Sequence, residues 1–589
     1  MNYPVWYLPT IGGGSLIALI AIVHVFVSHF AVGGGLYLIF AEKKGLAEKD
    51  QGILAFTRTH ARFFLLLTMV FGSITGVGIW FIIALVNPAA TSLLIHNFVF
   101  GWAAEWVFFT VEIAAAFTYY YTFGRMDDRS HLLVGWLYFV SAWMSLLLIN
   151  GIIGVMLTPG AWAENFAFWT GFFNPSFFPS LLFRTCAAVL LAGVYGFLTA
   201  SFTKDRQVAR TMTRFSGQWA LAALAGALPS GWWYLSMLPE QARNLVLGKS
   251  PTIAIVLQWG WPAILVLLFV ILIAGIFRPN LNYKPIAMLA MVCAFLSFGA
   301  FEWTREAARR PYVINEVMYS NSIGKNEVAT LDAKGFLPSA KWVSEKTVSA
   351  DNQSAAGREL FIQQCYACHT LGGGNNDLAR LTSRMNYPAL IRYIDRIHQA
   401  RYFMPPFAGT LAEKEALAAF IAGDLHGKEI TPPQTAGSGP APGQRLFDEH
   451  CSSCHSAEDL APAFAGKTSA AIAEILQSLD SISAEMTPFA GTIEERGLLS
   501  AHLAGEPTAA GAPASPAPPA GSEIFAGHCS SCHADTDMPE KLAQQDRQAI
   551  FTMLGKLNEL SEEMEPFSGT PAEREALADY LDRLNKGGN

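Results

Sequence analysis

The stretch Cys365-Tyr366-Ala367-Cys368-His369 decides the fold of the C-terminal part of this chain, because its Cys-x-x-Cys-His pattern occurs three times. The other copies are Cys451-Ser452-Ser453-Cys454-His455 and Cys529-Ser530-Ser531-Cys532-His533. This spacing is the attachment signature of c-type haem, in which both sulfurs bind the porphyrin and the histidine ligates the iron. The three copies use six of the eight cysteines. The sequence therefore predicts three covalently bound haems c.

A methionine follows each copy within a near-copy of Met-x-Pro-Phe-x-Gly-Thr, at Met404, Met486 and Met564. A methionine sulfur as the second axial ligand raises the reduction potential of a haem. Zinc would require a further Cys or His pair in each unit, and the sequence offers none, which argues against a zinc knuckle; a disulfide is the other alternative. Residues 351–589 resemble three small class I cytochromes c.

Hydropathy and charge divide the chain into two parts. Hydrophobic residues make up 52 % of the chain and charged residues 15 %, and the long apolar runs lie within residues 1–310. Residues 351–589 contain 17 Lys and Arg against 31 Asp and Glu, so their net charge is −14, whereas residues 1–350 carry +7. This acidic part excludes nucleic acid as a partner and favours a basic electron carrier such as a c-type cytochrome.

Eight apolar runs are each long enough to cross the lipid bilayer, which takes about 20 residues. They lie near residues 15–40, 62–86, 97–123, 132–157, 178–201, 214–237, 253–277 and 284–304. Lys and Arg concentrate in the loops after the first, third, fifth and seventh runs, which predicts that these loops are cytoplasmic. Both termini and the haem c region then face the periplasm of a bacterial inner membrane, where haem can be attached covalently.

These patterns predict an all-α fold, with an eight-helix transmembrane bundle made of two four-helix bundles and then three small α-helical cytochrome c domains. The expected membrane domain spans residues 1–312 and a linker spans 313–350. The expected cytochrome c domains span 351–428, 440–505 and 520–589. Residues 431–442 and 507–520 are rich in Pro and Ala, which is typical of semi-extended spacers.

Ionisable residues inside the predicted spans are candidates for function, because a charge in lipid is costly. They are His24 in the first span, Glu105 and Glu112 on one face of the third, Arg184 in the fifth, and Glu302, Arg305, Glu306 and Arg309 at the end of the eighth. A structural ion pair is the alternative for Glu302 and Arg305. We interpret the histidines at or near span ends as structural or interfacial: His29, His60, His96 and His131.

Four stretches of residues 1–320 resemble subunit I of cytochrome bd oxidases: 24–33, 108–125, 141–151 and 306–312. The resemblance implies that His24 and Glu306 are axial ligands of two closely spaced haems, b or d. It also implies that Glu112 lies near them on a proton route. Glu105, one residue off the register of the family, is a further candidate for both roles. A second membrane subunit is expected as a partner.

The chain departs from that family on the quinol side. Arg184-Thr185 stands where the family has the histidine ligand of a low-spin haem, and residues 251–268 offer no match for its methionine ligand. The quinol-binding loop is reduced to residues 239–249, and the ninth helix of the family is missing. We therefore expect haem c to replace quinol as the electron entry. Arg184 and Arg309 are expected to pair with a haem propionate or a carboxylate.

Two functions are compatible with these features. The first is a bd-like oxygen reductase subunit that receives electrons through its periplasmic haems c. The second is a non-oxidase subunit that links a quinone pool or a partner complex to haem c carriers. A membrane part that serves only as a haem-free anchor is a third interpretation.

Overall fold

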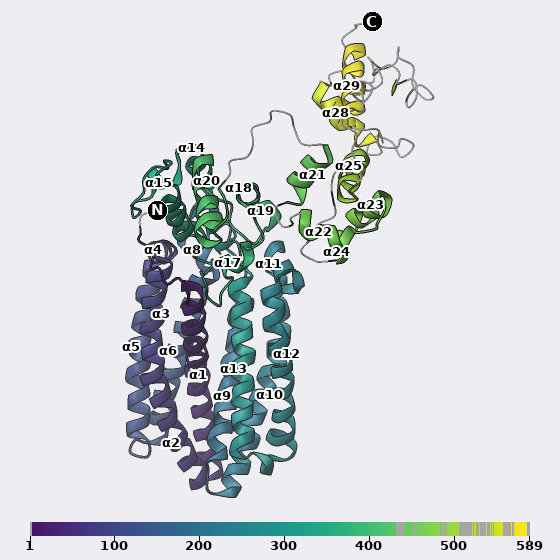
Figure 1. The fold of residues 1–589 in the computed structure, drawn as a ribbon. Helices are drawn as coiled ribbons and strands as arrows, with labels where there is room; N and C mark the ends of the chain where they lie inside the picture. Colours follow the sequence, from purple (N-terminus) through teal and green to yellow (C-terminus); the bar gives the residue numbers. More distant parts are fainter. Residues whose placement is uncertain are drawn as a thin grey trace. The chain divides into compact units, whose positions relative to one another are not determined.

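The computed structural model of the chain is built almost entirely from helices (Figure 1). It describes residues 3–430 without interruption, and then 442–452, 455, 457–482, 486, 489, 492–505, 521, 524–525, 529, 538, 542, 545, 547–557, 567 and 571–585. The chain divides into two compact units, one of residues 1–439 with 445–465 and one of residues 440–444 with 466–589. The predicted spacers at 431–442 and 507–520 fall almost wholly outside the described residues.

Eight long helices correspond to the eight predicted apolar runs. They are α1 (Gly13–Glu48), α2 (Gln51–Leu66) continued by η1 (Leu67–Gly72) and α3 (Ser73–Val86), α5 (Val99–Thr122), α6 (Asp128–Gly154), α9 (Phe177–Ser201), α10 (Arg206–Ser236), α12 (Pro251–Val270) continued by η3 (Ile271–Phe277), and α13 (Lys284–Ala307). Seven of these described helices are long and apolar enough to cross a membrane, and α10 is the exception. The polar first half of α10 accounts for this difference.

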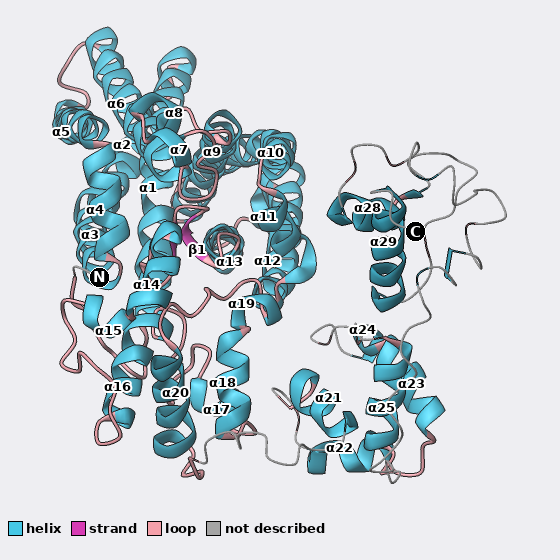
Figure 2. Cartoon of the chain, turned by 90° about the horizontal axis from the view of Figure 1, so that it is seen from above, coloured by secondary structure: helices cyan, strands magenta, loops and turns pink. Residues whose placement is uncertain are grey.

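The long helices form two groups of four, as the sequence predicts. One group contains α1, α2 with α3, α5 and α6, and the other contains α9, α10, α12 and α13. Helix α1 joins the groups, because Gly33 lies so close to α9 that an added Cβ would overlap the carbonyl oxygen of Ala188. Small residues permit such close approach between membrane helices. Viewed along the bundle, α13 lies between α1, α9 and α12 (Figure 2).

Helix α2 begins at Gln51, eleven residues before the predicted start of the second span. The Asp50 side chain caps it by accepting hydrogen bonds from the amides of Gly52 at 2.7 Å and Ile53 at 3.2 Å. An N-cap of this kind stabilises a helix start beyond the apolar stretch. Arg58 and Arg62 therefore lie on α2.

Short elements connect the long helices. Those of the membrane part are α4 (Pro88–Asn97), α7 (Trp162–Asn165), α8 (Phe168–Phe172), α11 (Glu240–Asn244), η2 (Leu245–Lys249) and η4 (Pro279–Leu281). After α13 come the antiparallel strands β1 (Tyr312–Ile314) and β2 (Met318–Tyr319), then η5 (Lys325–Glu327), α14 (Val328–Lys334) and α15 (Phe336–Ser339). Phe336 and Leu337 are buried in the same apolar core as the residues that follow position 351, so this segment packs against the first cytochrome c region.

The three Cys-x-x-Cys-His regions are small helical units. The first contains α16 (Gln353–Leu360), η6 (Phe361–Cys365), α17 (Leu378–Thr382), α18 (Tyr387–Asp395), α19 (Ile397–Ala400), α20 (Leu411–Ala419) and η7 (Phe420–Leu425). The second contains α21 (Pro442–His450), α22 (Ala457–Phe464), α23 (Ser469–Gln477), α24 (Leu479–Ile482) and α25 (Ile493–Leu503). The described part of the third contains α28 (Arg547–Leu554) and α29 (Pro571–Asn585).

One helix crossing recurs in all three regions. A glycine near the start of each region lies directly against the backbone of its last helix, where an added Cβ would overlap a carbonyl oxygen. The pairs are Gly357 with Ala416, Gly443 with Leu498, and Gly521 with Ala576. Since only glycine permits this approach, the repeated pattern of the sequence corresponds to a repeated packing of its first and last helices.

Candidate functional site

The first Cys-x-x-Cys-His segment forms one tight helical turn after η6. The amides of Cys368 and His369 donate to the carbonyl oxygen of Cys365 at 3.1 and 3.0 Å. The Nδ1 of His369 donates to the carbonyl oxygen of Asn376 at 2.9 Å. Because a carbonyl can only accept, this bond fixes the proton on Nδ1 and leaves the lone pair of Nε2 for a metal. Burial lowers the pKa of His369 and favours this neutral form.

The candidate axial residue Met404 lies in the loop between α19 and α20. Its carbonyl oxygen accepts a hydrogen bond from Nδ1 of His398 at 2.6 Å. Gln364, directly before Cys365, ties this loop to the attachment segment. It donates to the carbonyl oxygen of Ala408 at 2.7 Å and accepts from the Ala408 amide at 3.0 Å. The residues and hydrogen bonds of this unit therefore fit a covalently bound haem c.

The second and third units are described only in part. The amide of Cys451 donates to the carbonyl oxygen of Phe447, and the amide of His455 donates to that of Cys451, which reproduces the turn of the first unit. Met486 and Cys529 also lie among the described residues. The remaining predicted haem residues, Cys454, Cys532, His533 and Met564, lie outside them.

A buried cluster of charged side chains lies at the end of α13 that precedes β1. Glu302, 1 % exposed, accepts hydrogen bonds from Arg305 at 3.0 Å and from Arg184 of α9 at 3.4 Å. Glu306 accepts from Arg305 at 2.7 Å and forms an ion pair with Arg309. The cluster thus brings together the Arg184 and Arg309 that the sequence singled out. Both arginines pair with carboxylates of this chain.

His29 belongs to this cluster, although its sequence position suggested a structural or interfacial role. It lies in the middle of α1, is 2 % exposed, and donates from Nδ1 to the carbonyl oxygen of Val25 at 2.8 Å. Its Nε2 accepts from Arg184 at 3.4 Å. The sequence signal that could have identified it is the lone arginine in the apolar fifth span, which requires a polar partner on a neighbouring helix.

The two membrane residues that the bd resemblance assigns to haems differ in their surroundings. His24 points its Nδ1 toward the Thr75 hydroxyl at 3.2 Å and lies against Gly76 of α3, which leaves room for the ring. These surroundings fit an imidazole that ligates a haem through Nε2. The side chain of Glu306, 35 % exposed, is engaged by two arginines. In this arrangement Glu306 does not fit an iron ligand.

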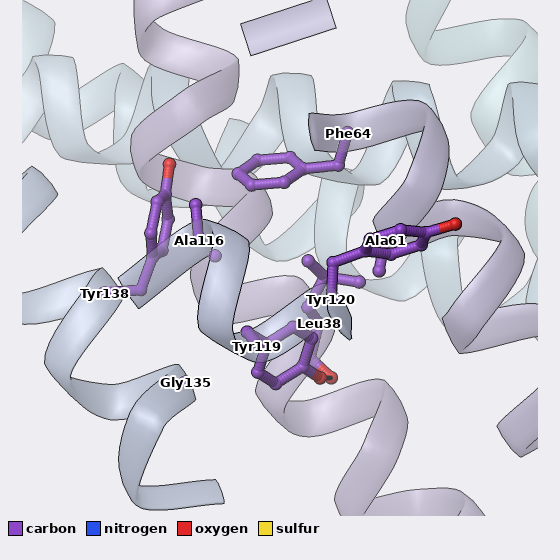
Figure 3. Close-up of a pocket in the computed structure, with 9 residues that line it drawn as sticks. Leu38, Ala61, Phe64, Ala116, Tyr119, Tyr120, Gly135 and Tyr138 are labelled. Atoms are coloured by element: carbon purple, nitrogen blue, oxygen red, sulfur yellow. Dashed lines mark hydrogen bonds between the residues drawn. The ribbon is translucent and has the colours of Figure 1, made fainter. Parts of the chain in front are cut away.

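Further polar side chains lie on α1, α5 and α6. The hydroxyl of Tyr138 lies 3.0 Å from Glu112 and 2.9 Å from the carbonyl oxygen of Ala31, and its single proton can be donated to one of these acceptors at a time. Tyr119 donates to Glu42 at 2.7 Å. Between the two tyrosine rings lies a small cavity (Figure 3), whose other lining residues are Gly35, Leu38, Ala61, Phe64, Ala116, Tyr120 and Gly135.

A buried ion pair lies beside Tyr119. His131 donates from Nδ1 to Glu42 at 2.7 Å and from Nε2 to the carbonyl oxygen of Tyr119 at 2.8 Å. Both ring nitrogens donate, so His131 is the charged imidazolium and neutralises Glu42. Glu105, which shares a helix face with Glu112, is only half-buried, whereas Glu112 is 7 % exposed.

Comparison with known proteins identifies the C-terminal region. The family model described as cytochrome c oxidase, cbb3-type, subunit III matches residues 352–421, 439–502 and 516–581. The predicted three cytochrome c domains are thus confirmed, and such domains imply haem c. No curated protein matches the chain significantly.

Among solved structures, the bd oxidase from Geobacillus thermodenitrificans is similar to this chain with 17 % sequence identity and a TM-score of 0.46. The match covers 51 % of this chain and 88 % of that one. Three cytochrome c domains joined to membrane-spanning helices make this chain a membrane electron-transfer protein.

Proposed function

We propose that this chain is the subunit of a bd-like oxygen reductase that takes its electrons from haem c domains rather than from quinol. One observation carries the proposal: the first cytochrome c domain lies on the end of α13 where the bd-like motif 306–312 is found. Phe403, next to Met404, packs against the buried cluster of Leu245, Ile253 and Ala307, of which Ala307 is the last residue of α13. Arg310 is close enough to His369 to lower the pKa of its imidazole.

The haem c ligands of the proposal are the residues of the three repeats. Each haem c supplies a one-electron carrier. The cysteine pairs 365 and 368, 451 and 454, and 529 and 532 would hold the porphyrins, and His369, His455 and His533 would ligate iron opposite Met404, Met486 and Met564. Within the first domain, Asn376 orients His369, and Gln364 holds the methionine loop in place.

The membrane domain is proposed to hold one or two haems b or d. His24 is the proposed ligand. Glu306 could ligate a haem only after leaving Arg305 and Arg309, so it has no role in the proposal. Glu112 with Tyr138, and Glu105 on the same helix face, are proposed to carry protons toward this region, because a carboxylate and a hydroxyl within 3.0 Å can exchange a proton.

The setting of the proposal is a bacterial inner membrane with both termini and the cytochrome c domains on the periplasmic side. A c-type cytochrome or another periplasmic carrier would donate electrons. A second membrane subunit would cover part of the apolar surface of α5, where Phe100 is 79 % exposed and Trp106 is 66 % exposed. Large exposed aromatic side chains of this kind contact either lipid or another subunit.

The test is oxygen consumption by the purified full-length complex with a reduced c-type donor. We expect turnover that His24→Ala abolishes and His96→Ala preserves, because His96 is exposed and bonds only within its own turn. Pyridine haemochrome spectra of the same samples count haems c, b and d. A complex that shows neither turnover nor a haem spectrum sensitive to carbon monoxide or cyanide would refute the oxidase.

The engagement of Glu306 by two arginines favours a second candidate. In it the chain is a non-oxidase subunit that connects a quinone pool or a partner complex to haem c carriers. Membranes that contain the whole complex would then reduce haem c when quinol is added, and the isolated chain would not. Oxygen uptake with the c-type donor would be absent in both samples.

A further inference from the structure

The first cytochrome c domain differs from the other two in charge. Residues 351–430 contain eight Lys and Arg and eight Asp and Glu, so they carry no net charge. Residues 431–589 contain nine Lys and Arg against 23 Asp and Glu. The acidic character of the C-terminal part thus lies entirely in the second and third domains. An electrostatic attraction for a basic carrier acts on those two domains and not on the first.

The first domain also differs in the residues around its attachment motif. Tyr366 stands between its two cysteines, where the other domains have Ser452 and Ser530. After His369 the chain continues with Thr370 and Leu371 and three consecutive glycines, which the other domains lack. These differences are confined to the part of the motif that the N-terminal segment of the chain touches.

That N-terminal segment, residues 7–14, binds the motif through its backbone. The Leu8 amide donates to the Tyr366 hydroxyl at 2.7 Å, and the Leu371 amide donates to the carbonyl oxygen of Pro9 at 2.9 Å. The ring of Tyr7 meets the ring of Tyr366 edge-on at a centroid distance of 4.9 Å. A serine in place of Tyr366 could not reach any of these partners.

The glycines after the motif permit a closer approach. An added Cβ at Gly373 would overlap the carbonyl oxygen of Thr10, whereas nothing lies within 4 Å of such an atom at Gly374. Gly12 has a φ of 74° and lies against Thr370, and α1 begins at the next residue. The motif therefore rests on the start of α1 with no intervening spacer.

The opposite side of the domain is held as well. The Gly409 amide donates to Asp332 at 2.9 Å, and Glu413 accepts from the amides of Phe336 and Leu337 at 2.9 and 2.7 Å. Tyr319, on β2, lies edge-on to His398 at a centroid distance of 6.3 Å, and His398 binds the Met404 carbonyl. The segment that follows α13 thus also holds the part of the domain that carries Met404.

We propose that residues 7–14 act as a clasp that locks the first cytochrome c domain onto the membrane helices, so that this domain is a fixed station for electrons on the membrane part. The inference rests on the proposed entry of electrons through the cytochrome c domains. The clasp itself is a structural claim that holds or fails independently of the terminal acceptor.

The test compares Gly373→Ala with Gly374→Ala in the full-length complex, because the two glycines are neighbours and only the first touches the clasp. Hydrogen exchange of the peptides that contain Leu8 and Leu371 should rise about tenfold in Gly373→Ala, since it loosens two backbone hydrogen bonds. Gly374→Ala should match the unaltered protein. Haem c content, measured by pyridine haemochrome, should equal that of the unaltered protein in both variants.

The second measurement follows the haem c absorbance after rapid mixing with a small-molecule reductant. The reduction of haem c should be unchanged in Gly373→Ala, and electron delivery to the membrane part should be largely lost. Unaltered exchange at Leu8 and Leu371 would overturn the clasp. Increased exchange with normal electron delivery would overturn the role as a fixed station. A chain that does not consume oxygen at all would still give the exchange result, so the two proposals fail separately.

Discussion

The first cytochrome c domain and the two that follow it share one sequence pattern and serve different surfaces. The first is electrically neutral and touches the membrane part through Tyr366 and Phe403. The second and third carry net charges of −6 over residues 440–505 and −7 over residues 520–589. A repeated unit has thus acquired a docking surface in one copy and an acidic surface in the other two.

The comparison indicates that the Cys-x-x-Cys-His motif determines haem attachment, whereas the residues around it determine which surface the domain contacts. The helical turn of Cys-x-x-Cys-His is the same in the first and second copies, and the glycine crossing at Gly357, Gly443 and Gly521 is common to all three. Position 366 and the glycine run after His369 are not needed for that turn. They are free to differ, and in the first copy they fit the backbone of residues 8–10.

The largest expected effect comes from removing one attachment pair at a time. Cys365→Ser with Cys368→Ser should abolish electron delivery to the membrane part, because the clasp holds this domain against the membrane helices. Cys529→Ser with Cys532→Ser should leave a measurable rate, because the second domain has a similar acidic surface. Haem staining should show the same loss of one haem in both variants. Equal losses of rate would remove the distinction between the domains.

The next effect concerns the buried charged cluster at the end of α13. Glu302→Gln leaves Arg184 buried without its carboxylate and removes one of the two carboxylates that Arg305 binds, and breaking a buried ion pair in this way costs about 3–5 kcal/mol. We expect a clear fall in the thermal unfolding temperature of the complex. The control is Glu316→Gln, whose exposed pair with Lys325 should contribute less than about 1 kcal/mol. Similar unfolding temperatures for the two variants would contradict the buried cluster.

A smaller effect is expected to distinguish two carboxylates that hold the same helix-capping position in the first and second domains. Glu413 caps α20 and also binds Phe336 and Leu337, so Glu413→Ala should destabilise the first domain by about 2–3 kcal/mol. Glu495 holds the same capping position in the second domain, and Glu495→Ala should cost about 1 kcal/mol. Hydrogen exchange at Phe336 and Leu337 should increase only in Glu413→Ala. An increase in both variants would show that residue 413 has no special role.

The smallest effect is the dependence of donor oxidation on salt. Raising the ionic strength should slow the reaction with a basic carrier by about tenfold, because the charges on the second and third domains are exposed to screening. Electron delivery from the first domain onward should not change, since its contacts are hydrogen bonds and apolar packing. A donor reaction that is independent of salt would argue against docking on the acidic domains.

Sequence patterns predicted the elements of this molecule well, because those elements depend on local rules. The Cys-x-x-Cys-His spacing identified three cytochrome c domains, and hydropathy located eight long helices. The early start of α2 was missed because the Asp50 cap, rather than an apolar run, determines it. The contact between the first cytochrome c domain and residues 7–14 could not be predicted, because Gly373 and Thr10, which meet there, are more than 350 positions apart in the sequence.

The candidate membrane site was predicted less completely for the same reason. His24, Glu112 and Arg184 were recognised because each is ionisable in an apolar run. The place of His29 depends on the packing of α1 against α9, which no local pattern encodes. The two arginines on Glu306 are its near neighbours in the sequence, and they change what that carboxylate can do.

The charged cluster at the end of α13 has an electrostatic consequence. Arg184, Arg305 and Arg309 outnumber Glu302 and Glu306 by one, so a fixed positive charge is held in a buried region. At a separation of about 10 Å and an effective dielectric constant of about 20, one such charge stabilises an arriving electron by about 1.7 kcal/mol. The cluster therefore favours the transfer of an electron from the first cytochrome c domain toward the membrane part, whichever acceptor receives it.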